Sequence, residues 1–140
     1  MPTLEDMLRA SLKGANERFE LANKALHSAV AEAAKAVEAV TGGKATLQLV
    51  EHGKRETGSR FDFVVTAESQ QRPLATFDVP NSGFPIRRLH DEGGFAESFP
   101  SAAALASYFQ KLASDQDSPL VAHLAYIVRN ASPDEGPIPF

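Results

Sequence analysis

The chain contains no cysteine among its 140 residues. This absence excludes disulfide bonds, thiolate metal ligands and a thiol nucleophile, and it permits a reducing compartment without requiring one. At this length a single domain can bury a sizeable hydrophobic core without covalent cross-links. We therefore expect packing alone to hold the fold together.

The first thirty residues contain no continuous apolar run, because Glu5, Asp6, Glu17 and Glu20 interrupt them. A signal peptide needs an apolar stretch of about 7–15 residues, and a membrane-spanning helix needs about 20. This stretch meets neither requirement. We therefore expect a soluble, cytoplasmic protein with no membrane partner.

Positive charge is scarce at one end of the chain. The formal net charge is −4, and it divides into −1 over residues 1–43, +2 over residues 44–90 and −5 over residues 91–140. Proteins that bind nucleic acid usually gather lysine and arginine on one face. A mildly basic middle followed by an acidic end argues against nucleic acid as the main partner.

Proline is missing from residues 3–41, a stretch rich in alanine, leucine, glutamate and lysine. Apolar residues recur there at alternating steps of three and four, which is typical of one face of an α-helix. They are Leu12, Ala15, Phe19, Ala22, Leu26, Ala29, Ala33, Ala36 and Val40. Thr3 followed by Asp6 resembles a capping box, and Gly42 can take the left-handed conformation that ends helices. The stretch predicts one long helix, whose apolar face the rest of the chain has to cover.

The length of this helix poses a problem for a compact domain. At 1.5 Å per residue an unbroken helix over residues 3–41 would be about 58 Å long, whereas a compact domain of this size is about 37 Å across. Either the helix bends near Gly14, or its first turns project and find a partner. The alanines on the face allow close approach by a sheet or by a second copy of the helix. A core helix lying across a sheet and a homodimer through this helix both remain open.

After Gly43 the apolar period changes from 3.6 residues to two, which indicates half-buried β-strands. The predicted strands cover residues 45–49, 60–65, 74–79, 84–89 and, less regularly, 94–99. The polar segment 51–59 predicts an exposed loop rather than a tight hairpin. Pro85 cannot donate to a sheet, so the fourth strand is expected at an edge or beginning at this proline.

Two short helices are predicted after the strands. Ser101 is a suitable cap for a helix ending near Ser114, and Ser118 with the proline after it suits the start of another. Helices and strands are segregated along the chain rather than alternating, so the fold class is α+β. A long N-terminal helix should pack on a four or five stranded antiparallel sheet, followed by two short C-terminal helices. We predict a single domain over residues 1–130 and a proline-rich, flexible tail over residues 131–140.

The densest polar group follows the fourth predicted strand and consists of Arg87, Arg88, His90, Asp91 and Glu92. A carboxylate can orient an imidazole and an arginine can stabilise a developing anion, so His90, Asp91 and Arg87 are weak candidates for acid–base catalysis. Successive strand residues point to opposite faces, so Arg87 and Arg88 cannot both line one pocket. A solvated turn with its own ion pairs accounts for the same residues.

No other motif supports catalysis or a cofactor. The four histidines include no pair at a helical spacing of three or four, so we predict no metal site. His52 could join His90 only if the segment after the first strand folds over the sheet edge. Ser82 lacks the context of a nucleophile elbow, and Gly42-Gly43-Lys44 leads into a strand rather than opening a phosphate-binding helix. We predict no cofactor.

These observations favour a non-catalytic protein-binding module, such as an adaptor, chaperone-like, inhibitor or immunity-type protein. The candidate partner-binding residues are Arg87, Arg88, His90, Asp91, Glu92, Lys54, Arg55 and the C-terminal Phe140. The alternative is a small enzyme or small-molecule binder using the His90, Asp91 and Arg87 region. Nucleic-acid binding on the sheet is the weaker hypothesis, because the strand phenylalanines lie at the period expected for the core.

Overall fold

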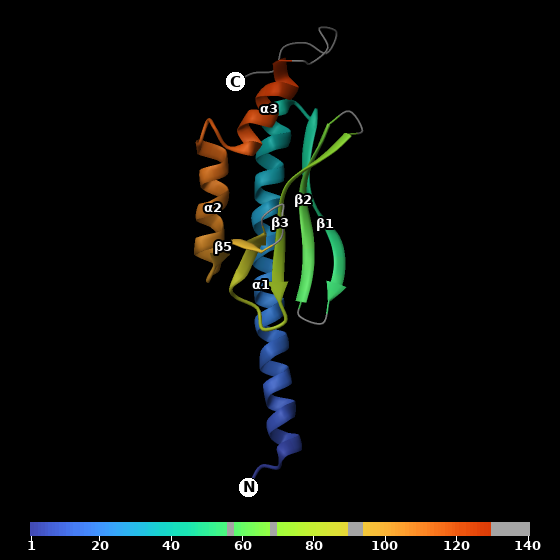
Figure 1. Ribbon diagram of the computed structural model, residues 1–140, viewed down its shortest axis with the longest axis vertical. Coiled ribbons are helices and arrows are strands. Elements are labelled where there is room, and N and C mark those ends of the chain that lie inside the picture. The colour runs from blue at the N-terminus through green and yellow to red at the C-terminus, as the bar shows by residue number, and fades with distance from the viewer. Residues whose placement is uncertain (56–57, 68–69, 90–93, 130–140) are drawn as a thin grey trace.

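The computed structural model describes residues 1–55, 58–67, 70–89 and 94–129. The helices among them are α1 (Leu4–Thr41), α2 (Ala102–Ser114) and α3 (Pro119–Arg129). The strands are β1 (Ala45–Arg55), β2 (Gly58–Ala67), β3 (Gln70–Pro80), β4 (Ile86–Leu89) and β5 (Phe95–Phe99). A long helix, then a sheet, then two helices is the α+β architecture expected from the sequence (Figure 1). The predicted tail, residues 131–140, lies outside the described residues.

The five strands form one antiparallel sheet in the order β1-β2-β3-β4-β5, so each strand pairs with its neighbour in the chain. Phe61 on β2 lies opposite Phe77 on β3, and both side chains are buried on the face that packs against α1 and α2. The other face is polar along the same strands, where Arg60 forms an ion pair with Asp78 at 3.3 Å. The described chain is thus a two-layer structure with its aromatic side chains on the helix side.

The segment between the first two strands is not the loop that its composition predicted. β1 continues to Arg55, which pairs with Gly58 at the start of β2. A bulge between Glu51 and Gly53 shifts the register by one residue and allows the pairing to continue. The alternation that marks a strand comes from burial of one face. Because Glu51 and His52 are both exposed, the sequence lacked this signal there.

α1 is unbroken over its 38 residues, so the helix is not interrupted at Gly14, where a bend was one of the two possibilities that the sequence left open. Its start is fixed by the predicted capping box: the Thr3 hydroxyl accepts from the Asp6 amide at 3.1 Å, and the Asp6 carboxylate accepts from the Thr3 amide at 3.2 Å. Gly42 ends the helix in the left-handed conformation, with φ at 62°. The other possibility therefore holds, because residues 3–17 project beyond the sheet (Figure 1). We call this segment the overhang.

The buried face of α1 is not the whole predicted stripe. Its buried residues are Ala22, Leu26, Val30, Val37 and Thr41. Leu12 and Val40, at the two ends of the predicted stripe, are exposed. The contacts with the sheet side begin at about Arg18, after the start of the stripe, so Leu12 has no described element to pack against.

Aromatic side chains fill the space between the sheet and α2. Phe77 is fully buried and lies within 6.3 Å, between ring centroids, of Phe63, Phe99, Tyr108 and Phe109. Such ring pairs stabilise a core beyond the area that they bury. This cluster holds α2 on the same side of the sheet as α1.

Both C-terminal helices begin at the serines that the sequence indicated. The Ser101 hydroxyl accepts from the Ala104 amide at 3.2 Å, and the Ser118 hydroxyl accepts from the Val121 amide at 3.1 Å. Ser118 also donates to the Leu112 carbonyl at 2.6 Å, which ties the start of α3 to the end of α2. Among the described residues, no helix is long and apolar enough to cross a membrane.

Candidate interaction surface

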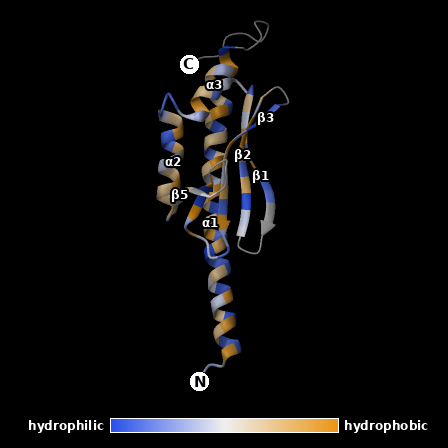
Figure 2. Cartoon of the chain, in the orientation of Figure 1, coloured by the Kyte–Doolittle hydropathy of each residue, from blue (hydrophilic) through white to orange (hydrophobic). Residues whose placement is uncertain are grey.

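The overhang exposes large apolar side chains in a regular row. Leu4, Leu8 and Leu12 are 78%, 63% and 62% exposed and follow one another at steps of four. From Leu12 the steps 3, 4, 3 and 4 lead to the buried Leu26, so the row continues the same helix face that the domain buries. Figure 2 shows hydrophobic residues, in orange, along the part of α1 that extends below the sheet. We call Leu4, Leu8 and Leu12 the leucine row.

The base of the overhang is held firmly against the domain. Arg18 donates through Nε to the Ser82 carbonyl at 3.3 Å, in the turn between β3 and β4. Gly83 in the same turn has φ at 90° and packs so closely that a Cβ there would lie 2.5 Å from the Arg18 carbonyl oxygen. About two and a half turns further along α1, the His27 ring meets the Phe61 ring edge to face at 5.1 Å. These contacts fix the direction in which the overhang leaves the sheet.

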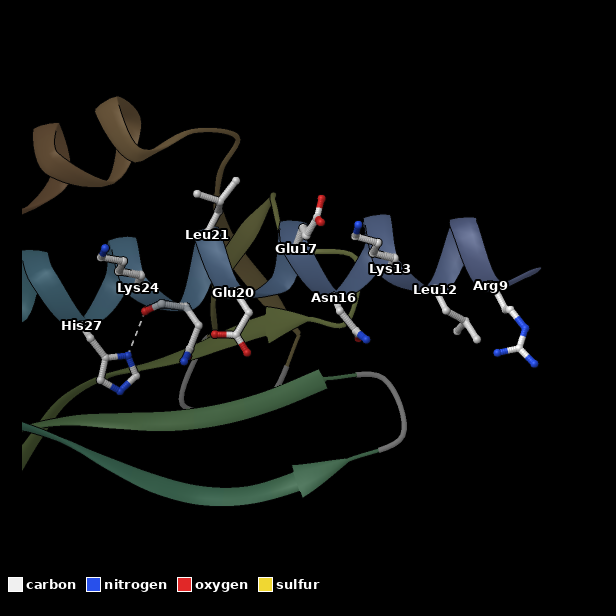
Figure 3. Close-up of a pocket in the computed structure, with 10 residues that line it drawn as sticks. Arg9, Leu12, Lys13, Asn16, Glu17, Glu20, Leu21, Lys24 and His27 are labelled. Carbon is white, nitrogen blue, oxygen red and sulfur yellow. Dashed lines mark hydrogen bonds between the residues drawn. The ribbon is translucent and has the colours of Figure 1, made fainter. Parts of the chain in front are cut away.

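A hollow of about 1080 Å³ runs along α1 from the overhang into the domain. It is lined by ten residues of the helix between Arg9 and His27. Both signs of charge occur among them, with Arg9, Lys13 and Lys24 beside Glu17 and Glu20. In Figure 3, Leu12, Asn16, Glu20 and His27 point to the side of β1 and β2, whereas Lys13, Glu17, Leu21 and Lys24 point away. The hollow is therefore a long, shallow surface flanking the leucine row. It is not a closed pocket in which a reaction could be shielded from water.

The two arginines of the predicted polar group lie on opposite faces of the sheet. Arg88 pairs in register with Phe77 on the helix side, and its guanidinium lies 5.7 Å from the centre of the Tyr108 ring. Arg88 also forms an ion pair with Glu97 at 3.4 Å. Arg87 pairs in register with Asp78 and so belongs to the polar face. The structure does not bring these two arginines into one site.

The remaining predicted site residues are only partly described. His90, Asp91, Glu92 and Phe140 lie outside the described residues. Lys54 and Arg55 belong to β1, but their side chains are likewise outside the description. His52 is exposed on β1. The alternative hypothesis of an enzyme or small-molecule binder that uses His90 and Asp91 is therefore not tested by the described residues.

A polar cluster that the sequence did not indicate joins the start of β3 to α3. Arg72 lies 3.4 Å, Nη1 to Nδ1, from His123, and the His123 ring stacks on Tyr126. These three residues line two adjoining hollows of about 460 and 480 Å³. Burial, and then the neighbouring Arg72 charge, lower the pKa of His123. The three residues are far apart in the chain and meet only through the tertiary fold, which is why the sequence alone gave no signal.

Among the groups that the structure describes, Tyr108 is the other one with a shifted pKa. Burial raises its pKa; the Arg88 charge opposes this rise and the Glu97 charge adds to it. Because its pKa is raised, Tyr108 stays neutral, and its ring packs in the core beneath the Arg88 guanidinium. We assign it no catalytic role.

Within residues 1–55, 58–67, 70–89 and 94–129, no three histidine or acidic side chains gather closely enough to hold a metal ion. Comparisons with protein-family profiles, curated proteins and solved structures found no match to this chain. The candidate site is therefore defined by its geometry alone.

Proposed function

We propose that this chain is a non-catalytic protein-binding module and that the overhang is its binding element. The observation that supports this most directly is the leucine row: three leucines exposed at helical spacing on a helix that leaves its own domain. Exposed apolar side chains in a contiguous row are typical of surfaces that another protein covers. The chemistry of the row fits the apolar face of a partner helix, as in helix-to-helix recognition.

The charges around the row add specificity to this surface. Glu5, Arg9 and Lys13 flank the leucines, and none of these side chains belongs to the domain core. Charges at the edge of an apolar contact surface influence the orientation and the choice of the partner more than they influence the affinity. An adaptor, a chaperone-like factor, an inhibitor or an immunity-type protein could each present such a helix to its partner.

The experiment compares three versions of the immobilised chain in cell extract: wild type, Leu8→Arg and Leu21→Arg. Leu21 is also an exposed leucine of α1, at 66%, but it lies about 140° around the helix from Leu8. Proteins that bind the leucine row should be retained by wild type and Leu21→Arg and lost from Leu8→Arg. Identical retention by all three versions would contradict the proposal.

A second candidate function is the binding of a small anion at Arg72, His123 and Tyr126. Arg72 and His123 converge on adjoining hollows whose lining contains no described carboxylate. An anion between them would offset the unfavourable proximity of two groups that can both be cationic. Inorganic phosphate should therefore raise the pKa of His123, measured by NMR, in wild type but not in Arg72→Gln. An enzyme that uses Arg87, His90 and Asp91 stays an alternative prediction, because two of these residues lie outside the described part.

A further inference from the structure

We infer that the partner of the overhang is the overhang of a second copy of this chain, paired antiparallel about a twofold axis near Leu8. This inference rests on the proposed function, since it names the occupant of the same surface. The pairing buries the leucine row of each copy against the row of the other. It uses a face that is continuous with the core face of α1.

In the part of the chain that the structure describes, the C-terminal helix lies far from this row. α3 packs against the far end of α1, where Leu120, Val121 and Leu124 line a groove with Val37 and Val40. From Val40 back to Leu8 is about 48 Å along the helix. We therefore assign the row to a second molecule.

The covered face of α1 decides the orientation of the pair. From Phe19 onward the face that carries the leucine row packs on the sheet and α2. A second helix running parallel along the row would meet the sheet and α2 of both copies at the same end. An antiparallel partner instead carries its domain away in the opposite direction. Only the antiparallel arrangement leaves the space beside the row empty for its full length.

The charges of the overhang complement themselves in this arrangement. Glu5 and Arg9 form an exposed ion pair at 3.3 Å within one copy. With Leu8 on the axis, Leu4 of one copy faces Leu12 of the other. Glu5 of each copy then lies close to Arg9 of the other copy, which gives two symmetric ion pairs. In a parallel, in-register pair the two copies would carry Glu5 and Arg9 on opposite flanks of the leucine row, so these ion pairs between copies would not form.

The length of the overhang matches the length that this pairing requires. Arg18, where the contacts with the domain begin, lies about 15 Å from Leu8, and Thr3 lies about 8 Å on the other side. The tip of each overhang therefore stops about 7 Å short of the other copy's domain. Only residues 3–13 of each copy overlap, about 11 on each side, which is fewer than the 20–30 of a standard interface, so we expect a weak dimer, with a Kd on the order of micromolar.

The test is the solution mass of the full chain by analytical ultracentrifugation between about 1 µM and 1 mM, the range in which a dimer of this strength dissociates. The wild type should move from the monomer mass of 15.0 kDa towards twice that value as its concentration rises. Leu8→Arg should remain a monomer, and Leu21→Arg should dimerise like the wild type. A wild type that is monomeric throughout, or a Leu8→Arg variant that dimerises equally well, would overturn the inference. Circular dichroism verifies that both variants fold.

Charge exchange tests the orientation separately. Glu5→Arg and Arg9→Glu should each weaken dimerisation about fivefold, because two exposed ion pairs are lost per dimer. The double variant should restore it. Small-angle X-ray scattering of the dimer should give a maximum dimension of about 100 Å, since two 57 Å helices overlap only at their ends. A parallel dimer would be much shorter, and a double variant weaker than either single variant would contradict the predicted pairs.

The self-pairing and the proposed function can fail independently. A monomeric wild type whose bound proteins are lost from Leu8→Arg would refute self-pairing and leave the overhang as a binding element. A dimer that Leu8→Arg disrupts, with no protein lost from that variant in extract, would show that the overhang serves only a second copy.

Discussion

Gly83 packs closely against Arg18, at the base of the overhang. Its positive φ of 90° suits glycine, and its missing side chain leaves room for the Arg18 carbonyl. Gly43 provides a matched comparison, because its φ is 83° but a Cβ there would meet nothing within 4 Å. Substituting alanine at each position therefore distinguishes the cost of backbone strain, present at both, from the cost of a steric clash, present only at Gly83.

We expect Gly43→Ala to lower the free energy of unfolding by about 1 kcal/mol, the cost of a left-handed alanine. Gly83→Ala should lower it by about 3 kcal/mol, because the turn or α1 must also move. Urea denaturation followed by circular dichroism measures both values. Equal losses in the two variants would show that the close approach to Arg18 contributes nothing.

His123 provides a second prediction at the residue scale. Its pKa is lowered first by burial and then by Arg72, so Arg72→Gln should raise the pKa towards its ordinary value. A histidine with a lowered pKa binds its proton more weakly in the folded chain than in the unfolded chain. The wild type should therefore lose stability as the pH falls below about 6.5, and Arg72→Gln should lose less.

NMR titration of the His123 ring protons measures this shift, and urea denaturation at several pH values measures the stability. Arg9→Gln is the control, since Arg9 lies in the overhang and should leave the titration of His123 unchanged. If the pKa of His123 is the same in wild type and Arg72→Gln, burial alone lowers it and the anion site loses its support.

At the scale of single elements, the sequence predicted most of what is local. The capping residues Thr3, Ser101 and Ser118 start helices as expected, and Gly42 ends α1. These signals depend on neighbours within four residues, so they can be read directly from the chain. The extension of β1 to Arg55 depends on pairing with β2 and gave no such signal.

The exposure of the candidate site depends on tertiary structure more than the helix ends do. The sequence predicted a long apolar stripe and left open whether it bends or projects, because Gly14 permits either. Only the position of the sheet edge, at about Arg18, decides that Leu12 is exposed while Leu26 is buried. The contact of Arg72 with His123 likewise requires the packing of α3 beside β3.

Gly14 allows the overhang to be stabilised without altering its surface row. It lies inside α1, and an added Cβ would meet only the Arg18 guanidinium at 3.8 Å. Gly14→Ala should stabilise the helix locally by about 1 kcal/mol. Hydrogen exchange should slow about fivefold for amides of the overhang in the Leu8→Arg background, with no change for residues 22–41. Slower exchange in both parts would show that the overhang and the core unfold together.

For the whole molecule, the exposed overhang and the buried core predict two distinct transitions. The overhang of a monomer is a helix of about 15 residues without a partner, and such helices are marginal and melt gradually. The core is stabilised by the cluster around Phe77 and should unfold cooperatively. A single transition would require the overhang to contribute to the core.

We therefore expect the Leu8→Arg monomer to lose part of its far-ultraviolet circular dichroism gradually on heating, before the cooperative loss of the tertiary signal from Tyr108. A chain shortened to begin at residue 15, with an added Ser as cap, should lose the gradual phase and keep the midpoint of the cooperative one. The wild type at high concentration should also lose the gradual phase, because a paired overhang no longer frays. If the shortened chain unfolds at a much lower temperature, the overhang is part of the domain's own stability, and its leucines would then not be reserved for a partner.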